Sequence, residues 1–224
     1  CLNNLKQLGY AWIMYAGDNN GRLIESNPWQ MNPQGIRVQN SANPYCWAPG
    51  YVGPGVNQTY GAFPLHSPTN REGLKISVFY KYYSNVDLLR CSAENRLWNG
   101  QPVVRSFAMN CWMAGGQVSS KGTVFWKESQ IKNPSHLWVL IDEDELTIDD
   151  GYFFTDVDGG RGWINIPSRR HNFGFAWNFA DGHSEIYKIT DPLLRNLKTS
   201  PGSEGLGGSQ GTDDFRMFTN RTTM

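Results

Sequence analysis

The amino-acid sequence predicts an α+β fold in which an N-terminal amphipathic helix packs on an antiparallel β-sheet, with long irregular loops between the elements. Three observations support this prediction. Apolar residues at the start recur with the spacing of a helix, whereas residues after position 103 tend to alternate with the period of a strand. The 224 residues also include 24 glycines and 12 prolines, which favour turns. We divide the chain into a helix at 1–20, a globular domain at 21–200, and a flexible Gly/Ser segment with a C-terminal tail at 201–224.

The first helix is predicted from one apolar face within residues 1–16. The residues of this face recur at intervals of three and four: Leu2, Leu5, Leu8, Trp12 and Ala16. The sequence GDNNG at 17–21 then ends the helix. Because an isolated helix of this length is marginally stable in water, we expect its apolar face to pack on the sheet.

Residues 22–70 are rich in Pro, Gly, Asn and Ser and show little periodicity, so they are predicted to be mostly irregular. A second helix is predicted over Arg71–Tyr83 and is expected to end at Ser84. Its apolar face contains Leu74, Val78, Phe79 and Tyr82.

The strands are predicted from β-branched and aromatic segments at Val103–Met109 and His136–Ile141. Residues 173–189 have the clearest pattern, because two alternating segments flank Asp181-Gly182. An Asp-Gly pair supplies the positive φ angles of a type I′ turn, so we predict a β-hairpin. Phe173, Phe175, Trp177 and Phe179 are expected on one face, with Ile186 and Tyr187 across from them.

Residues 199–211 form a Gly/Ser-rich segment that is predicted to be flexible, followed by a short piece that can dock as a last helical turn. Residues 207–211 match the letters of the G-x-S-x-G motif of hydrolases. That motif carries chemistry only between a strand and a helix, and no strand is predicted before it, so we interpret the match as accidental.

Composition excludes some classes of function. Twenty basic residues balance twenty acidic ones and the longest basic run is Arg169-Arg170-His171, so we expect no nucleic-acid partner. No apolar stretch reaches the length of a membrane span. The four cysteines allow three complete pairings, and buried free thiols are an equally good interpretation: Cys1, Cys46, Cys91 and Cys111. Their spacings match no zinc motif.

Several segments resemble one protein family in order and spacing. The opening CLNNLKQLGYAWIMYAGDNNGRL is similar to the segment that follows the membrane helix of prepilin-like proteins common in planctomycetes and verrucomicrobia. His171, nine further residues and then Asp181-Gly182 resemble the H-x9-D-G motif of the prepilin-type processing-associated domain. The segments LLRCSAENR, SFAMN and IDEDE also resemble the family, although Ser92 stands where it often has proline.

The resemblance implies a non-enzymatic structural subunit of a type II secretion or type IV pilus-like assembly, which acts by polymerising. Residues 1–20 would be the C-terminal half of a long pilin-like helix whose hydrophobic N-terminal half is missing from the sequence. The full-length protein would be anchored in the inner membrane, with its globular domain periplasmic or extracellular. Its partners would be like subunits and other pseudopilins, contacted through the missing helix segment.

A metal-dependent enzyme is an alternative hypothesis, based on His171, Asp181 and His183 with Asp142 and Glu143 nearby. Histidines and carboxylates can bind a divalent metal that supports hydrolysis. The favoured interpretation is structural, with Asp181 as a turn residue and His171 as a hydrogen-bonded side chain.

Calcium is a second candidate ligand, because carboxylates cluster between residues 142 and 158: Asp142, Asp144, Asp149, Asp150, Asp156 and Asp158. Residues 156–159 begin like an EF-hand loop, but Gly160 and Pro167 occupy positions that need ligands. The favoured interpretation is a solvated acidic loop without a cofactor, and calcium stays an alternative.

A cell-surface or filament-tip module that binds polysaccharide is the remaining alternative. Trp29, Trp47 and Trp98 fall in predicted loops, where they could stack on sugars. The tryptophans on periodic faces are expected in the core: Trp12, Trp138 and Trp177.

Overall fold

The computed structural model describes residues 1–31, 37–50, 52, 67–115, 122–158 and 160–223. Its largest sheet has five strands in the order β7-β5-β6-β8-β9. These strands are β5 (Phe107–Asn110), β6 (Trp138–Asp142), β7 (Tyr152–Phe153), β8 (Gly174–Phe179) and β9 (Ser184–Lys188). The α+β prediction is confirmed. The sheet is mixed rather than wholly antiparallel, because β7 pairs with β5 in parallel while the other neighbours are antiparallel.

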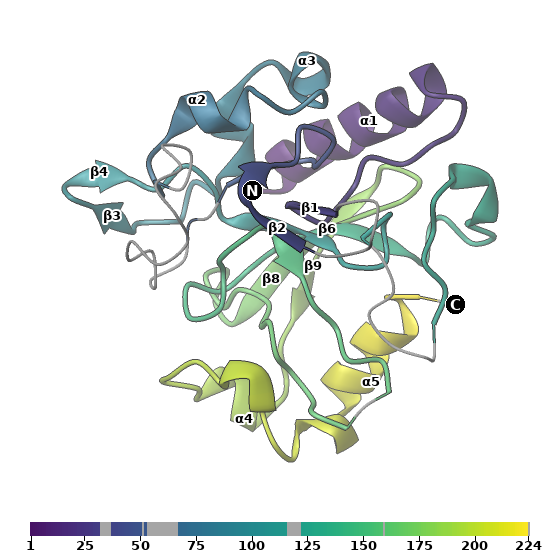
Figure 1. The fold of residues 1–224 in the computed structure, drawn as a ribbon. Coiled ribbons are helices and arrows are strands. Elements are labelled where there is room, and N and C mark those ends of the chain that lie inside the picture. Colours follow the sequence, from purple (N-terminus) through teal and green to yellow (C-terminus); the bar gives the residue numbers. More distant parts are fainter. Residues whose placement is uncertain (32–36, 51, 53–66, 116–121, 159, 224) are drawn as a thin grey trace.

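One face of this sheet is covered by the helix α1 (Leu2–Asp18), as predicted (Figure 1). The buried residues of α1 include most of the predicted face: Leu5, Leu8, Trp12 and Ala16. Leu2 departs from the prediction, since 37% of it is exposed. Helix and sheet approach closely at Gly9, where a Cβ atom would lie 2.4–2.7 Å from side-chain atoms of Asn178 on β8.

The opposite face of the sheet is covered by an aromatic cluster that includes the helix α5 (Asp213–Asn220). Figure 1 shows α1 and α5 on opposite sides of the sheet. Because both faces are covered, every residue of β6 and β8 is buried. The buried aromatic residues of this second core are Trp138, Phe153, Trp163, Phe175, Trp177, Phe179, Phe215 and Phe218.

Residues 201–223 are part of this packing, although the Gly/Ser-rich segment at 199–211 was expected to be flexible and only a last helical turn was expected to dock. They include short 3-10 turns at Gly202–Glu204 and Ser209–Gly211 before α5. The Ser209 hydroxyl is buried and accepts a hydrogen bond from the backbone N–H of Trp163. Thr212 caps α5 by accepting from the N–H of Phe215. Two phenylalanines of α5 enter the second core, so this terminal piece docks as more than a single helical turn.

The predicted helix over Arg71–Tyr83 is wrong, because two short helices, α2 (Arg71–Leu74) and α3 (Tyr80–Tyr83), replace it. Between them the backbone N–H of Val78 donates to the carbonyl of Pro44, 2.8 Å away, rather than to a carbonyl one turn earlier. A further helical turn, α4 (Pro192–Arg195), follows β9.

The predicted hairpin is present as β8 and β9, but its turn differs from the predicted type I′. Gly182 donates to the carbonyl of Phe179 at 2.8 Å, so the two central turn residues are Ala180 and Asp181. Neither has a positive φ, whereas Gly182 has a φ of +90°. This is the geometry of a type I turn followed by a glycine bulge.

Two small sheets lie in the loop regions: β1 (Trp29–Met31) with β2 (Arg37–Ala42), and β3 (Leu97–Trp98) with β4 (Gln101–Pro102). The first sheet falls within the stretch 22–70 that was predicted to be mostly irregular, and residues 53–66 of that stretch lie outside the described residues. No helix in the described ranges has the length and apolarity that a bilayer crossing requires.

Candidate functional site

A disulfide joins Cys1, at the start of α1, to Cys91 in the loop before β3. The side chain of Asn4 donates to the carbonyl of Arg90 at 3.0 Å, and Ser106 accepts from the N–H of Cys91 at 2.7 Å. These contacts attach the first turn of the helix to the Cys91 loop. The sequence left open whether the cysteines form disulfides or stay as buried thiols. The structure contains both, because Cys1 and Cys91 form a disulfide whereas Cys46 and Cys111 are buried free thiols.

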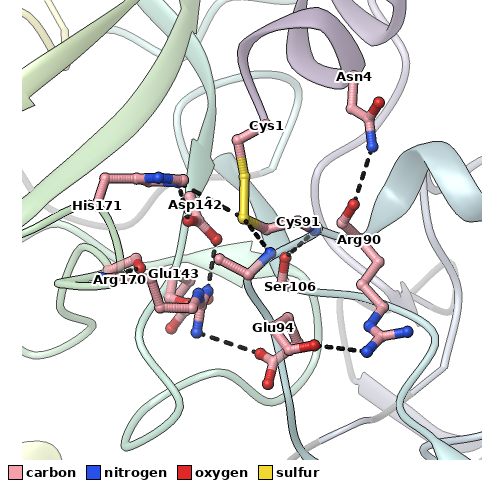
Figure 2. The surroundings of a disulfide bond; sticks show 12 residues. Cys1, Asn4, Arg90, Cys91, Glu94, Ser106, Asp142, Glu143, Arg170 and His171 are labelled. Atoms are coloured by element: carbon pink, nitrogen blue, oxygen red, sulfur yellow. Dashed lines mark hydrogen bonds and ion pairs between the residues drawn. A yellow bond between two sulfur atoms is a disulfide. The ribbon is translucent and has the colours of Figure 1, made fainter.

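His171 and Asp142 lie beside this disulfide (Figure 2). The Nε2 atom of His171 is 3.5 Å from the Cys91 sulfur and 3.3 Å from Oδ2 of Asp142. Asp142 ends β6 and is fully buried, whereas His171 precedes β8 and is 19% exposed. Because β6 and β8 are neighbouring antiparallel strands, the end of one lies beside the start of the other.

Two arginines and two buried carboxylates extend this cluster. Arg170 bonds to Oδ1 of Asp142 and to a carboxylate oxygen of Glu94, and Arg96 bonds to the same Glu94. Burial alone would raise the pKa of Glu94, but the hydrogen bond from Arg96 and the charge of Arg170 outweigh it, so the pKa is lowered. Burial would lower the pKa of Arg170, and the charges of Asp142 and Glu94 raise it instead. Glu94 and Arg170 therefore stay charged at neutral pH.

A different buried carboxyl group, Glu143, has no arginine bonded to it. Its Oε1 accepts from Asn165 at 2.6 Å and from Thr147 at 3.0 Å, and its Oε2 is buried without a partner. Burial raises the pKa of Glu143 to about 8, although the Asn165 hydrogen bond and the charge of Arg105 oppose this shift. The side chain is closed off from solvent. It is therefore a neutral structural group at pH 7 rather than an accessible acid.

The alternative grouping of His171 with Asp181 and His183, on which the metal-dependent enzyme hypothesis was based, is wrong. Asp181 Oδ1 lies 2.6 Å from Nδ1 of His183, at the tip of the hairpin. His171 lies at the base of the hairpin beside Asp142. The six residues of β8 separate the two places, and a strand of that length spans roughly 20 Å. The two ends of the H-x9-D-G motif thus belong to separate sites, and Asp181 serves in a turn as the favoured interpretation expected.

The calcium candidates do not converge, and arginines bind three of them. Arg170 bonds to Asp142, Arg169 bonds to both oxygens of Asp144, and Arg161 bonds to Asp156. Asp158 is exposed. In the part of the chain that the structure describes, the acidic residues form no cluster suited to calcium. The expected solvated loop is also wrong for Asp142, Asp144 and Asp156, which are buried ion-pair partners.

The tryptophan candidates for sugar binding do not gather on one described surface. Trp47 is fully buried and its indole N–H donates to the carbonyl of Gly151, so it cannot stack on a polysaccharide. Trp98 is half-buried in β3, and the side chain of Trp29 lies outside the described residues. Trp126, which the sequence did not single out, is 49% exposed. The three tryptophans expected in the core are buried there: Trp12, Trp138 and Trp177.

Sequence reasoning expected Asp142 near His171, which the structure confirms, but it missed the two cysteines beside them. Cys1 and Cys91 fit no metal spacing, since 90 residues separate them. One sequence feature could have pointed to this cluster: the segment LLRCSAENR, which resembles the family and contains both Cys91 and Glu94. We compared the chain with protein-family models, curated proteins and solved structures, and none matched.

Proposed function

We propose that this chain is the globular domain of a pilin-like structural subunit, which acts by assembling with like subunits rather than by catalysing a reaction. One observation carries the proposal. The helix α1 buries one face on the sheet, yet its outer face presents three large apolar side chains to solvent. These are Leu2, Tyr10 and Met14, which are 37%, 49% and 57% exposed.

The three side chains follow one row of the helix surface, because positions separated by four residues lie one above the other. Lys6 is the fourth member of this row, and its ammonium lies 5.9 Å from the centre of the Tyr10 ring. An apolar row with a single charge suits packing against the helix of a neighbouring subunit better than it suits solvent. A second copy of the chain is therefore the partner that we propose for this face.

The sequence resemblance supports the same function. In pilin-like proteins, the segment similar to residues 1–20 continues a hydrophobic helix that anchors the subunit in the inner membrane and packs in the filament. The proposal includes that anchor, with the domain outside the membrane in the periplasm or beyond. The bonds at Cys1 and Asn4 support it further, because they hold the start of α1 rigidly to the domain.

The paired charges favour assembly over catalysis. Asp142 and Glu94 are each bonded to arginine and fully buried. A catalytic acid or base must reach the substrate within hydrogen-bonding distance, and neither group reaches solvent.

The test is to place charges on the outer face of α1 in the full-length gene product, expressed in its own host. The double substitution Tyr10→Glu and Met14→Glu should remove the subunit from the sheared filament or assembled fraction, because two buried charges would be unpaired in the interface. The isolated domain should keep its Tm, since both positions are exposed. The matched control is Leu97→Glu on the separate β3–β4 ribbon, where Leu97 is 63% exposed. The proposal is overturned if the double variant assembles as the wild type does.

A further inference from the structure

Four side chains around the Cys1–Cys91 disulfide have the composition and spacing of a metal site. A sulfur atom from each cysteine, a carboxylate oxygen of Asp142 and a ring nitrogen of His171 all lie within 4.8 Å of one another. Cys91 and Asp142 are buried, and Cys1 and His171 are half-buried. Figure 2 shows that these side chains come from α1, the Cys91 loop, the end of β6 and the turn before β8. Among the described residues no other such group of three or more is present.

The chemistry of this set fits zinc. Two thiolates, one imidazole and one carboxylate are four ligands of the types that Zn²⁺ accepts in tetrahedral sites. Thiolates select against calcium and magnesium, which prefer oxygen ligands. While the disulfide is intact, however, its sulfur atoms are bonded to each other and are not thiolates. A metal can therefore use this set only after the disulfide has been reduced.

Asp142 provides an independent indication of a ligand. Its Oδ1 accepts a hydrogen bond from Arg170, but its Oδ2 is buried and has no hydrogen-bond partner. Nε2 of His171 lies 3.3 Å from Oδ2, a contact that is an ion pair only when the imidazole is protonated. A buried carboxylate oxygen rarely stays unsatisfied. This oxygen and the imidazole nitrogen lie side by side next to the sulfur atoms, as two ligands of one ion would.

The surrounding charges balance in both redox states. With the disulfide intact, the two carboxylates Glu94 and Asp142 are neutralised by Arg96 and Arg170. Two thiolates with one Zn²⁺ add no net charge to this cluster. Two thiolates alone would instead leave an excess of buried negative charge, which is costly. The reduced site is therefore electrostatically satisfied when it holds a divalent metal.

The site also has the outer contacts that support metal ligands. Arg170 orients Asp142 through Oδ1, and the backbone N–H of Ala93 donates to the Cys91 sulfur at 3.4 Å. Hydrogen bonds of this kind fix the direction of a ligand and tune its affinity for the metal.

We propose that reduction of the Cys1–Cys91 disulfide creates a zinc site formed by Cys1, Cys91, Asp142 and His171. A dithiol reductant transfers two electrons and two protons to the disulfide and itself becomes a disulfide. Both cysteine thiols then release their protons to solvent as Zn²⁺ binds the two thiolates, Oδ2 of Asp142 and Nε2 of His171. This site does not depend on the proposed assembly function.

The test compares the oxidised chain with chain that has been reduced by dithiothreitol and desalted without oxygen. Each sample receives Zn²⁺, is dialysed, and its metal content is measured by mass spectrometry. We expect one zinc per reduced chain and none per oxidised chain. With Co²⁺ as the probe, the reduced chain should show a thiolate-to-cobalt charge-transfer band and the strong visible bands of tetrahedral cobalt.

Three variants make the assignment specific. His171→Ala should weaken zinc binding by at least about 100-fold, the upper range for losing even an outer-sphere contact. His183→Ala, at the other end of the hairpin, is the matched control and should bind zinc as the wild type does. The double variant Cys1→Ser/Cys91→Ser should abolish the charge-transfer band, because it removes both thiolates of the site and leaves only the buried thiols Cys46 and Cys111. Circular dichroism of each variant establishes that it is folded. The inference is overturned if the reduced chain takes up no zinc, or if folded His171→Ala binds it as tightly as the wild type.

Discussion

The contact between α1 and β8 at Gly9 gives a sharp test of how the helix sits on the sheet. A Cβ atom at Gly9 would lie 2.4 Å from Nδ2 and 2.5 Å from Oδ1 of Asn178. That amide is held in place, because its Nδ2 donates to the carbonyl oxygens of Gly182 and His183 and to the hydroxyl of Ser184. An alanine at position 9 must therefore move the helix or break these bonds.

The expected cost follows from two opposing effects. Overpacking of a tight interior costs about 1–3 kcal/mol, and each lost hydrogen bond of Asn178 costs about 1 kcal/mol. Alanine is better than glycine in a helix by about 1 kcal/mol, which offsets part of this loss. Gly9→Ala should thus lower the free energy of unfolding by about 1–3 kcal/mol. In a chain of this length, Tm falls by about 2–4 °C for each kcal/mol.

Gly17→Ala is the matched control, because it makes the same change in the same helix. Nothing lies within 4 Å of a Cβ atom at Gly17, so the helix preference of alanine should appear alone, as a gain of about 0.4–1 kcal/mol. Urea unfolding followed by circular dichroism and tryptophan fluorescence measures both variants. If Gly9→Ala is as stable as Gly17→Ala, the register of α1 on β8 described above is wrong.

Three further changes test other parts of the structure. Reduction of the Cys1–Cys91 disulfide in the presence of a chelator should lower Tm by about 10 °C. The disulfide spans 90 residues, and closing a loop of that length is worth about 4–5 kcal/mol. The Cys1→Ser variant should melt at the lower temperature and should not respond to reductant. The pKa of Glu143 is raised from 4.5 to about 8, so the folded state keeps a proton that the unfolded state releases. The contribution of protonated Glu143 to the free energy of unfolding is therefore complete below pH 4.5 and is lost as pH rises to 8, by up to about 1.4 kcal/mol per pH unit. Glu143→Gln should flatten this pH dependence, measured by urea titrations between pH 5 and pH 8. Thr222→Val should lower the free energy of unfolding by about 1–3 kcal/mol, because it leaves the buried indole N–H of Trp138 without its acceptor. The control Thr219→Val, on the partly exposed side of α5, should change it by less than about 0.5 kcal/mol. Equal effects of the two variants would contradict the described docking of the tail.

The periodic parts of the fold could be predicted from the sequence because their periodicity comes from burial. The apolar face of α1 reflects one buried side. Both sides of β8 are buried, and its alternation separates the large aromatic residues of the second core from the small or polar residues that face α1. Both elements were found. The tail was misjudged because its glycines and serines were given more weight than its capping residues. Thr212 followed by two aspartates is a helix start, and Phe215 and Phe218 share a face of the helix that follows.

The candidate site could be predicted only in part, because long-range pairings create it. Nothing local in the sequence joins Cys1 to Cys91, and four cysteines leave several pairings open. The position of Asp142 beside His171 depends on the register of β6 against β8, which has an irregularity between Trp138 and Leu140. A one-residue shift in a strand turns each side chain to the other face, so the strand prediction alone could not place this carboxylate.

The spacing of the H-x9-D-G motif has a physical explanation in this structure. Asn172 and Phe173 have positive φ angles and form the turn that leads into β8. The six residues of β8 follow, and Ala180 completes the interval before Asp181. The nine residues are therefore the length of one strand with its two turns. One end places His171 against Asp142, and the other closes the hairpin with Asp181 and Gly182. Because a residue added or removed within β8 would reverse its faces, the aromatic core on one side and the contact with Gly9 on the other fix this interval. The motif thus sets the geometry of two separate sites, and only its histidine end lies within reach of the cysteines.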